Sequence, residues 1–334
     1  MGKSLIYFFS DYIIMEKKKI LFIGVGFHEY DNHIIDHLKI KYEVWYLWSS
    51  EFVQKHPYIH YMSSKLPRII PNYSSNSITR YIENTKDCNF DIIFVIKGSN
   101  LREDHLALLK EYHPHAVYKL YLWDEWRIMK NGEMLKRHFP TIYSFDSEDC
   151  KKYGFIFRPL FYLDNSKIEN KKYDLSFIGG EHSGRLETIM RIKKLCIEND
   201  LSFYFLISTR FSIIIKLMFK SFYLYIKCNS MLKRGGIPYN EFLKITRNSK
   251  TVLDIHYYRQ SGITMRTLEA LATGAKVITT NEHIREYKNI PSNMYYIWNM
   301  KEVDEIVGFI KEPVGDFKID DYYSVDSFIN DILN

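Results

Sequence analysis

Cysteine is scarce in this sequence: its 334 residues include four, far apart at Cys88, Cys150, Cys196 and Cys228. None of them belongs to a CxxC pair or to a cluster with histidine at the spacing of a metal site. The small number excludes a disulfide-stabilised scaffold and indicates reduced thiols in a cytosolic protein. No metal ligand set is expected from this pattern.

Long blocks of like charge are also missing, and 46 basic against 40 acidic residues leave a formal net charge of +6. This balance does not indicate a nucleic-acid-binding tail, whereas an anionic substrate or an anionic lipid suits it. The apolar run within residues 1–16 is broken by Ser10 and Asp11 and lacks a small-residue cleavage site. We therefore expect an N-terminal extension there, neither a signal peptide nor a membrane span.

Short apolar runs alternate with polar or helix-forming stretches along the chain. The first series of runs covers 20–23, 42–48, 90–98 and 116–124, and the second covers 173–180, 201–207, 250–257 and 276–281. Such alternation is typical of parallel sheets with helices on both faces. We predict two tandem Rossmann-like domains, 17–160 and 172–315, facing a central cleft, with a linker near 160–172 and a helical tail at 316–334.

Two glycines follow the first predicted strand in the segment GVGFHE, residues 24–29. This resembles the start of a dinucleotide fingerprint, but Glu29 stands where the third glycine is required. The segment therefore argues against an NAD-dependent oxidoreductase. His28 is a candidate general base near neutral pH, with a plain surface loop as the alternative.

The segment SFIGGEHSGR places Gly179 and Gly180 at the end of a predicted strand, and then Ser183 and Arg185 at a helix start. Backbone N–H groups, a hydroxyl and a guanidinium would converge where a diphosphate binds. A tight turn would also explain the glycines. It would leave Arg185 as a cation against the positive end of the helix dipole, so the anion site is preferred.

The most informative segment runs from 254 to 281 as DIHYYRQSGITMRTLEALATGAKVITTN. It combines a strand, a polar loop, a helix and a second buried strand. Together with YLWDEW, SFDSEDCKKYGF and YDLSFIGG, this pattern resembles GT-B glycosyltransferases. In particular it is similar to the bacterial lipopolysaccharide and capsule biosynthesis branch with a CgeB-like C-terminal domain.

The resemblance implies that Glu269 holds the ribose hydroxyls of a nucleotide-sugar donor, and that the loop 260–264 faces its phosphates. Arg266 lies one helical turn before Glu269, so the two side chains either bracket the nucleotide or bridge each other. Ser261 occupies the position of a second glutamate in many retaining relatives, which leaves the stereochemistry open. The expected nucleotide-binding residues are Gly179, Gly180, Ser183, Arg185, Gln260, Gly262, Thr264, Arg266, Glu269 and Asn281.

Asp124 follows the predicted strand at 116–123 and should point into the cleft, where a carboxylate can deprotonate an acceptor hydroxyl. A helix N-cap is the competing interpretation. No Asp-x-Asp follows a strand, and the acidic cluster at 146–149 reads as a capping box. We therefore expect a metal-independent reaction in which Arg185, Arg266 and helix N-termini neutralise the leaving diphosphate.

The stretch 210–228 is apolar, with Arg210, Lys216, Lys220 and Lys227 spaced to gather on one helical side. It predicts a basic amphipathic helix, either docked on an anionic membrane surface or packed between the domains. Lysines in its middle disfavour a membrane span.

These observations predict a cytoplasmic glycosyltransferase that uses a nucleotide sugar as co-substrate and no other cofactor. The basic amphipathic stretch adds a peripheral position at the inner face of the membrane as one option. From the resemblance alone, the acceptor is expected to be a glycan or lipid-linked glycan of bacterial surface polysaccharide or lipopolysaccharide synthesis. The alternatives are an NAD-dependent oxidoreductase and a non-catalytic nucleotide-binding protein of the same fold.

Overall fold

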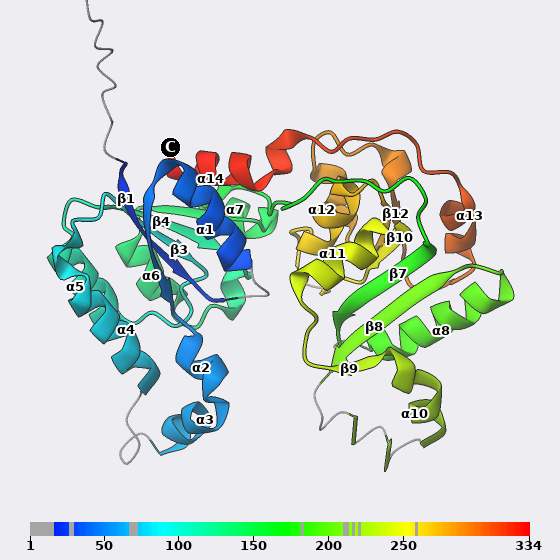
Figure 1. The fold of residues 1–334 in the computed structure, drawn as a ribbon, viewed down its shortest axis with the longest axis horizontal. Helices are drawn as coiled ribbons and strands as arrows, with labels where there is room; N and C mark the ends of the chain where they lie inside the picture. Colours follow the sequence, from blue (N-terminus) through cyan, green and yellow to red (C-terminus); the bar gives the residue numbers. More distant parts are fainter. Residues whose placement is uncertain are drawn as a thin grey trace, which may run out of the picture.

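The structure is a computed structural model that describes residues 17–26, 30–66, 73–181, 184–209, 214–215, 218–219, 222–257 and 260–334. Figure 1 shows two α/β units, one built from the first half of the chain and one from the second. Within these residues, no helix combines the length and the apolar character that a bilayer crossing would need.

The first unit is a six-stranded parallel sheet in the order β2-β1-β3-β4-β5-β6. Its strands are β1 (Lys19–Gly24), β2 (Glu43–Trp48), β3 (Ile92–Ile96), β4 (Val117–Leu122), β5 (Thr141–Ser144) and β6 (Ile156–Phe157). Its helices are α1 (Tyr30–Lys41), α2 (Glu51–Lys55), α3 (Pro57–Lys65), α4 (Tyr73–Asn84), α5 (Glu103–Tyr112), α6 (Gly132–His138) and α7 (Ser147–Tyr153). Continuous apolar runs suit these strands because helices cover both faces of the sheet.

The second unit is also a six-stranded parallel sheet, in the order β12-β11-β10-β7-β8-β9. Its strands are β7 (Tyr173–Gly180), β8 (Phe203–Thr209), β9 (Leu232–Arg234), β10 (Ser249–Asp254), β11 (Lys276–Thr279) and β12 (Tyr295–Ile297). Its helices are α8 (Arg185–Glu198), α10 (Phe222–Cys228), α11 (Tyr239–Arg247), α12 (Met265–Ala272) and α13 (Glu305–Lys311). The predicted class of two tandem Rossmann-like domains is confirmed.

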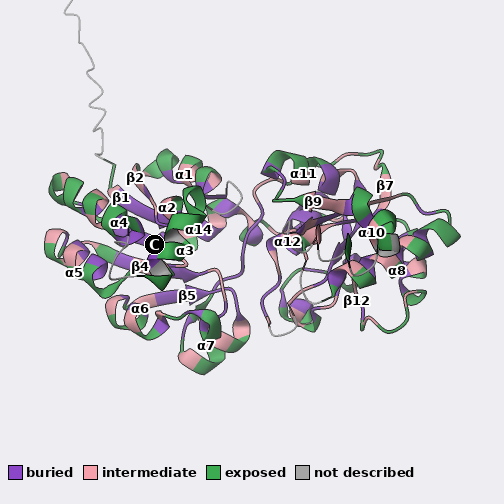
Figure 2. Ribbon diagram, turned by 90° about the horizontal axis from the view of Figure 1, so that it is seen from below, coloured by how far each residue is buried: buried purple, intermediate pink, exposed green. Residues whose placement is uncertain are grey.

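Short 3₁₀ turns complete the described part of the chain, at Lys86–Cys88, Trp126–Ile128, Asn229–Met231, Glu282–Glu286, Ser292–Met294 and Asp321–Tyr323. Figure 2 shows that buried residues follow the strands of both sheets, while exposed residues gather on the outer helices. In β1, Ile20 and Phe22 enter one apolar cluster and Leu21 and Ile23 enter another. This alternation places one cluster on each face of the sheet.

The last helix, α14 (Val325–Leu333), returns to the first unit and lies beside α1, as Figure 1 shows. Its approach is set by backbone bonds from Tyr162 N to Tyr323 O at 2.8 Å and from Val325 N to Tyr162 O at 3.1 Å. The buried guanidinium of Arg158 pairs with Asp331 at 2.8 Å. One apolar cluster therefore continues from the first sheet through α14 into α12.

Candidate functional site

A cavity of about 620 Å³ lies between the two domains, at the carboxyl ends of both sheets. In each sheet it adjoins the place where the strand order reverses. On the first side Val25 follows β1 and Lys97 follows β3, whereas on the second side Gly180 ends β7. Parallel α/β sheets bind ligands at such switch points, because neighbouring loops diverge there and leave a crevice.

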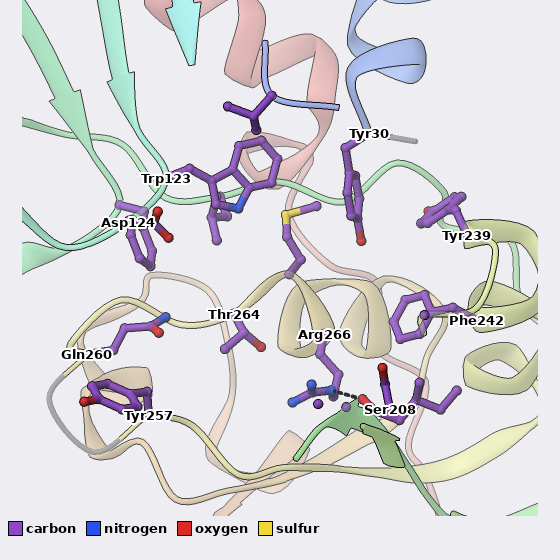
Figure 3. A pocket seen from close by; sticks show the side chains of 18 of the residues that line it. Tyr30, Trp123, Asp124, Ser208, Tyr239, Phe242, Tyr257, Gln260, Thr264 and Arg266 are labelled. Carbon is purple, nitrogen blue, oxygen red and sulfur yellow. Dashed lines mark hydrogen bonds between the residues drawn. The ribbon is translucent and has the colours of Figure 1, made fainter. Parts of the chain in front are cut away.

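Aromatic side chains form a large part of the cavity wall (Figure 3). Tyr30 lies between Trp123 and Tyr239, with ring centroids 5.8 Å and 5.3 Å away, respectively. Phe242 and Tyr257 line the cavity from the second domain. Flat apolar faces of this kind suit sugar rings and nucleobases.

The first-domain wall carries an ion pair between Lys97 Nζ and Asp124 Oδ2 at 2.5 Å. Both side chains are about one-third exposed and line the cavity. Lys97 has a left-handed backbone conformation, with φ of 68°. Asp124 thus points into the cleft as expected. It does not cap a helix, because Glu125 occupies the N-cap of the following 3₁₀ turn.

Arg266 is the cation of the second-domain wall. Its Nε donates to Ile178 O at 2.8 Å, Nη1 pairs with Asp254, and the guanidinium lies 5.3 Å from the ring centroid of Phe177. A Cβ on Gly179 would stand 2.9 Å from Arg266 Nη2 and 2.8 Å from the Phe177 ring. Gly179 is therefore required for the close approach of Arg266 to the end of β7.

Asp254, at the end of β10, is a key residue that sequence reasoning did not assign to the site. It is fully buried and accepts bonds from Thr264 Oγ1 at 2.9 Å and Thr267 Oγ1 at 2.6 Å. Burial alone would raise the pKa of this carboxyl, but Arg266 and the two hydroxyls outweigh it, so the pKa is lowered. The sequence did contain a signal for this role. Asp254 ends a buried strand, and the threonine that caps the next helix follows ten residues later.

Thr264 lines the cavity and caps α12, where its hydroxyl accepts from Thr267 N. The first amides of a helix have no partner within the helix and carry partial positive charge. Since Asp254 holds both Thr264 and Arg266, it fixes this positive helix end and the guanidinium in the same wall. The arrangement can bind a phosphate group.

Arg185 does not face the cavity, which corrects the prediction of a guanidinium at a diphosphate. Its side chain is buried, Nη1 donates to Gly180 O at 3.0 Å, and Nη2 donates to Ile255 O. Burial and the neighbouring Arg266 lower the pKa of Arg185 to about 10. The Arg185 guanidinium thus binds two backbone carbonyls at the strand ends. Gly180, in contrast, lines the cavity. Ser183 and His28 lie outside the described residues.

The loop 260–264 is held from both domains. Asp146 caps α7 through Asp149 N at 3.0 Å, as predicted, and its other oxygen also accepts from Ser261 N at 2.9 Å and Gly262 N at 3.3 Å. Asn281 donates to the carbonyls of Ser261 and Gly262, both at 3.1 Å. This loop was expected to face the donor phosphates, but the backbone N–H groups of Ser261 and Gly262 bind Asp146 instead.

Gly262 and Asn281 consequently belong to the support of this loop, which corrects their predicted place in the cavity wall. Asn281 is buried, and a Cβ on Gly262 would stand 2.6 Å from Phe145 O, across the domain interface. Gln260 and Thr264 do line the cavity. Contacts between the two domains cannot be inferred from the order of residues in the sequence. Gly262 and Asn281 were therefore interpreted as ligand-binding residues.

Glu269 is fully buried, which corrects the expectation that its carboxylate opens to the cleft. Its Oε1 accepts from Tyr239 OH at 2.9 Å and Leu163 N at 3.2 Å. Its Oε2 is buried and has no hydrogen-bond partner among the described residues. Burial raises the pKa of Glu269 to about 8. Arg266 pairs with Asp254, not with Glu269.

Among the described residues, no group of three or more histidine, cysteine, aspartate or glutamate side chains is arranged to hold a metal ion. The charges in the cavity wall are Lys97 and Arg266 against Asp124 and Glu125.

No protein-family model and no curated protein matches the sequence. Solved structures do match in fold. A glycosyltransferase from Rickettsia africae superposes with a TM-score of 0.56 at 12% identity, covering 95% of both chains. OtsA gives 0.53 at 10% identity, covering 95% of this chain and 99% of that one. The UDP-GlcNAc 2-epimerase of Methanocaldococcus jannaschii, in complex with UDP-GlcNAc and UDP, gives 0.50 at 13% identity, covering 95% and 99%.

At these identities the likeness establishes the architecture alone. In this chain that architecture is two six-stranded parallel sheets with a cavity between them. The chain has the two-domain GT-B fold.

Proposed function

We propose that this protein is a glycosyltransferase that moves a sugar from a nucleotide-sugar donor to an acceptor hydroxyl. The observation that carries the proposal is the pairing of two unlike walls around one cavity. Arg266 and the start of α12 form a phosphate-binding wall, and Asp124 with Lys97 stands on the opposite side. A donor and an acceptor need such facing sites to react directly.

The donor diphosphate is placed at the N-terminus of α12, beside Arg266 and Gly180. Leu206, Ile237 and Phe242 offer apolar surface to the base. Glu269 is buried behind the cavity wall and accepts a hydrogen bond from Tyr239, which lines the cavity, so we assign it a supporting role there and no contact with the ribose.

Asp124 is the proposed acceptor-side base, and His28 remains a second candidate. The Asp124 carboxylate takes the proton of the acceptor hydroxyl while that oxygen attacks the anomeric carbon. The bond from the anomeric carbon to the diphosphate oxygen breaks, and the diphosphate leaves with the electron pair. In this single displacement the anomeric configuration inverts. Arg266 and the helix N-terminus stabilise the leaving charge without a metal ion.

The proposed acceptor is a lipid-linked glycan of bacterial surface polysaccharide or lipopolysaccharide synthesis at the cytoplasmic leaflet. The segment 210–228 supports membrane-surface docking, although much of it lies outside the described residues. Phe219, Phe222 and Ile226 are exposed in its described part. The sequence from 201 to 240 contains Arg210, Lys216, Lys220, Lys227, Lys233 and Arg234 and no acidic residue.

A thermal-shift panel of nucleotides and nucleotide sugars tests the donor site, because a ligand that binds only the folded state raises its melting temperature. We expect a nucleoside diphosphate and its sugar to stabilise the protein and NAD to have no effect. Product analysis with lipid-linked acceptors, with and without EDTA, then tests transfer. Release of an epimerised sugar without transfer, or activity that EDTA abolishes, would contradict the proposal.

A further inference from the structure

Helix α3 of the first domain presents a row of exposed apolar side chains to solvent. Tyr58 is 85% exposed, and the other exposed members on or beside the helix are Ile59, Tyr61, Met62, Leu66 and Tyr73. Single exposed apolar residues are common on soluble proteins, but a contiguous group marks an interaction surface. We call these six residues the α3 patch.

The α3 patch lies in an acid-free part of the chain. From 52 to 82 the sequence contains Lys55, Lys65, Arg68 and Arg80 and no aspartate or glutamate, and Lys55 is paired with Glu51, just before this stretch, at 2.6 Å. The Lys65 ammonium lies 5.8 Å from the Tyr61 ring centroid, so charge and aromatic surface are adjacent. Aromatic and basic side chains together suit the boundary between lipid headgroups and acyl chains.

The second domain has a counterpart in Met218, Phe219, Phe222 and Ile226, with Phe219 88% exposed. We call these four residues the α10 patch. In Figure 1, α3 and α10 project from the same edge of the molecule, one from each domain. Figure 2 views that edge from below, and both helices again appear there, one on each side of the domain boundary.

The chain that leads into α3 is bonded to the cavity wall. Before α3, the Trp48, Ser50 and Gln54 side chains all donate to Val25 O, and Val25 lines the cavity. On the other side, β8 carries Ser208 in the cavity wall and ends one residue later. The α3 patch is therefore linked through α2 to the cavity wall.

We infer that the α3 and α10 patches form a two-part docking surface for an anionic lipid bilayer, with one part on each domain. This inference extends the proposed lipid-linked acceptor, and the new element is the part supplied by α3. Charge complementarity selects the bilayer, because both patches sit in basic segments without acidic residues. Binding through both domains would hold the cleft toward the membrane and present a lipid headgroup to it.

Flotation of the full-length protein with phosphatidylcholine vesicles, with and without phosphatidylglycerol, tests the surface. The variants are Tyr58→Ser with Met62→Ser for the α3 patch and Phe219→Ser with Phe222→Ser for the α10 patch. The matched control is Ile40→Ser on α1, a position that is exposed and outside both patches. We expect each double variant to bind phosphatidylglycerol vesicles about tenfold more weakly than wild type, and high salt to weaken wild-type binding.

The inference is overturned if the α3 variant floats as well as the Ile40 control, or if wild type binds neutral vesicles equally well. It is also overturned if light scattering shows a dimer that the α3 substitutions dissociate, because a second copy would then cover the patch. The thermal shift with nucleoside diphosphate should be unchanged in both double variants. Vesicle binding without any nucleotide-induced shift would instead contradict the proposed function and leave the docking surface standing.

Discussion

On the second-domain wall of the cleft, the fully buried Asp254 pairs with Arg266, which lines the cavity, and two threonine hydroxyls and a carbonyl complete the arrangement. On the first-domain wall, the pair of Lys97 and Asp124 is partly exposed and stands among aromatic rings. The first arrangement is rigid because each buried polar group is fixed by several partners. The second leaves a carboxylate accessible to a substrate.

From this difference we infer that the two walls have different functions. A rigid, buried network positions one invariant chemical group, such as a diphosphate, whereas an accessible carboxylate meets a hydroxyl and exchanges a proton. Variants of one wall should therefore change turnover, and variants of the other should change nucleotide binding or folding.

Asp124→Asn tests the first-domain wall and should have the largest effect. We expect turnover to fall by about 10²–10⁴-fold, the usual contribution of a positioned general base. Nucleotide affinity, measured by calorimetry, should stay at the wild-type value. A rate equal to wild type would remove Asp124 from the mechanism and leave His28→Ala as the next variant to measure.

Asp254→Ala tests the rigidity of the second-domain wall. Removing one partner of a buried ion pair should lower the free energy of unfolding by about 3–5 kcal/mol. Urea denaturation measures this, with Glu198→Ala as the control, since Glu198 belongs to an exposed pair with Lys194 at 3.5 Å. The control should change stability by at most about 0.5 kcal/mol. Equal effects of the two substitutions would mean that the buried network adds little.

Arg266→Ala tests phosphate recognition, and because it leaves the buried carboxylate of Asp254 without its cation, it should also lower the free energy of unfolding. A charge-assisted hydrogen bond contributes about 1.5–3 kcal/mol, so affinity for a nucleoside diphosphate should fall by about 10–150-fold. Affinity for the nucleoside alone should change much less. Arg185→Ala is the matched comparison, because Arg185 binds carbonyls and does not line the cavity. If Arg185→Ala alone lost the preference for the diphosphate, the assignment of the two arginines would be reversed.

Glu269→Gln should alter the pH dependence of stability. Burial raises the pKa of Glu269 from 4.5 to about 8, so the folded state keeps a proton that the unfolded state releases. Wild-type stability should therefore fall as pH rises from about 4.5 to about 8, by about 1.4 kcal/mol for each unit of pKa difference retained. Urea titrations at several pH values should show a flatter profile for Glu269→Gln. A wild-type profile in the variant would mean that Glu269 is ionised in the folded protein.

Strand assignments were accessible from the sequence because buried parallel strands are continuous apolar runs, as in 20–23 and 276–279. The approximate site was accessible too, since ligand loops follow such strands. Gly179, Gly180, Gln260, Thr264 and Arg266, which the sequence led us to expect at the nucleotide, all line the cavity. Their functions in catalysis and binding remain predictions.

Other assignments depended on partners distant in the sequence. Arg185 was expected at a diphosphate, yet it binds Ile255 O, and Glu269 was expected in the cleft, yet it meets Tyr239 and Leu163. Both are polar residues next to a switch point. A polar side chain there can bind either a ligand or a group of the protein itself, and the sequence does not show which.

The sequence by itself therefore determined two parallel sheets, the loops that border the cleft, and the residue types available there. Tertiary structure alone decided which of those side chains face the cavity and which are used to hold it. The physical reason is that a buried polar group must find a hydrogen-bond partner. For Asp146, Asp254 and Asn281 that partner is a loop or helix end fixed by folding, and no local pattern specifies it.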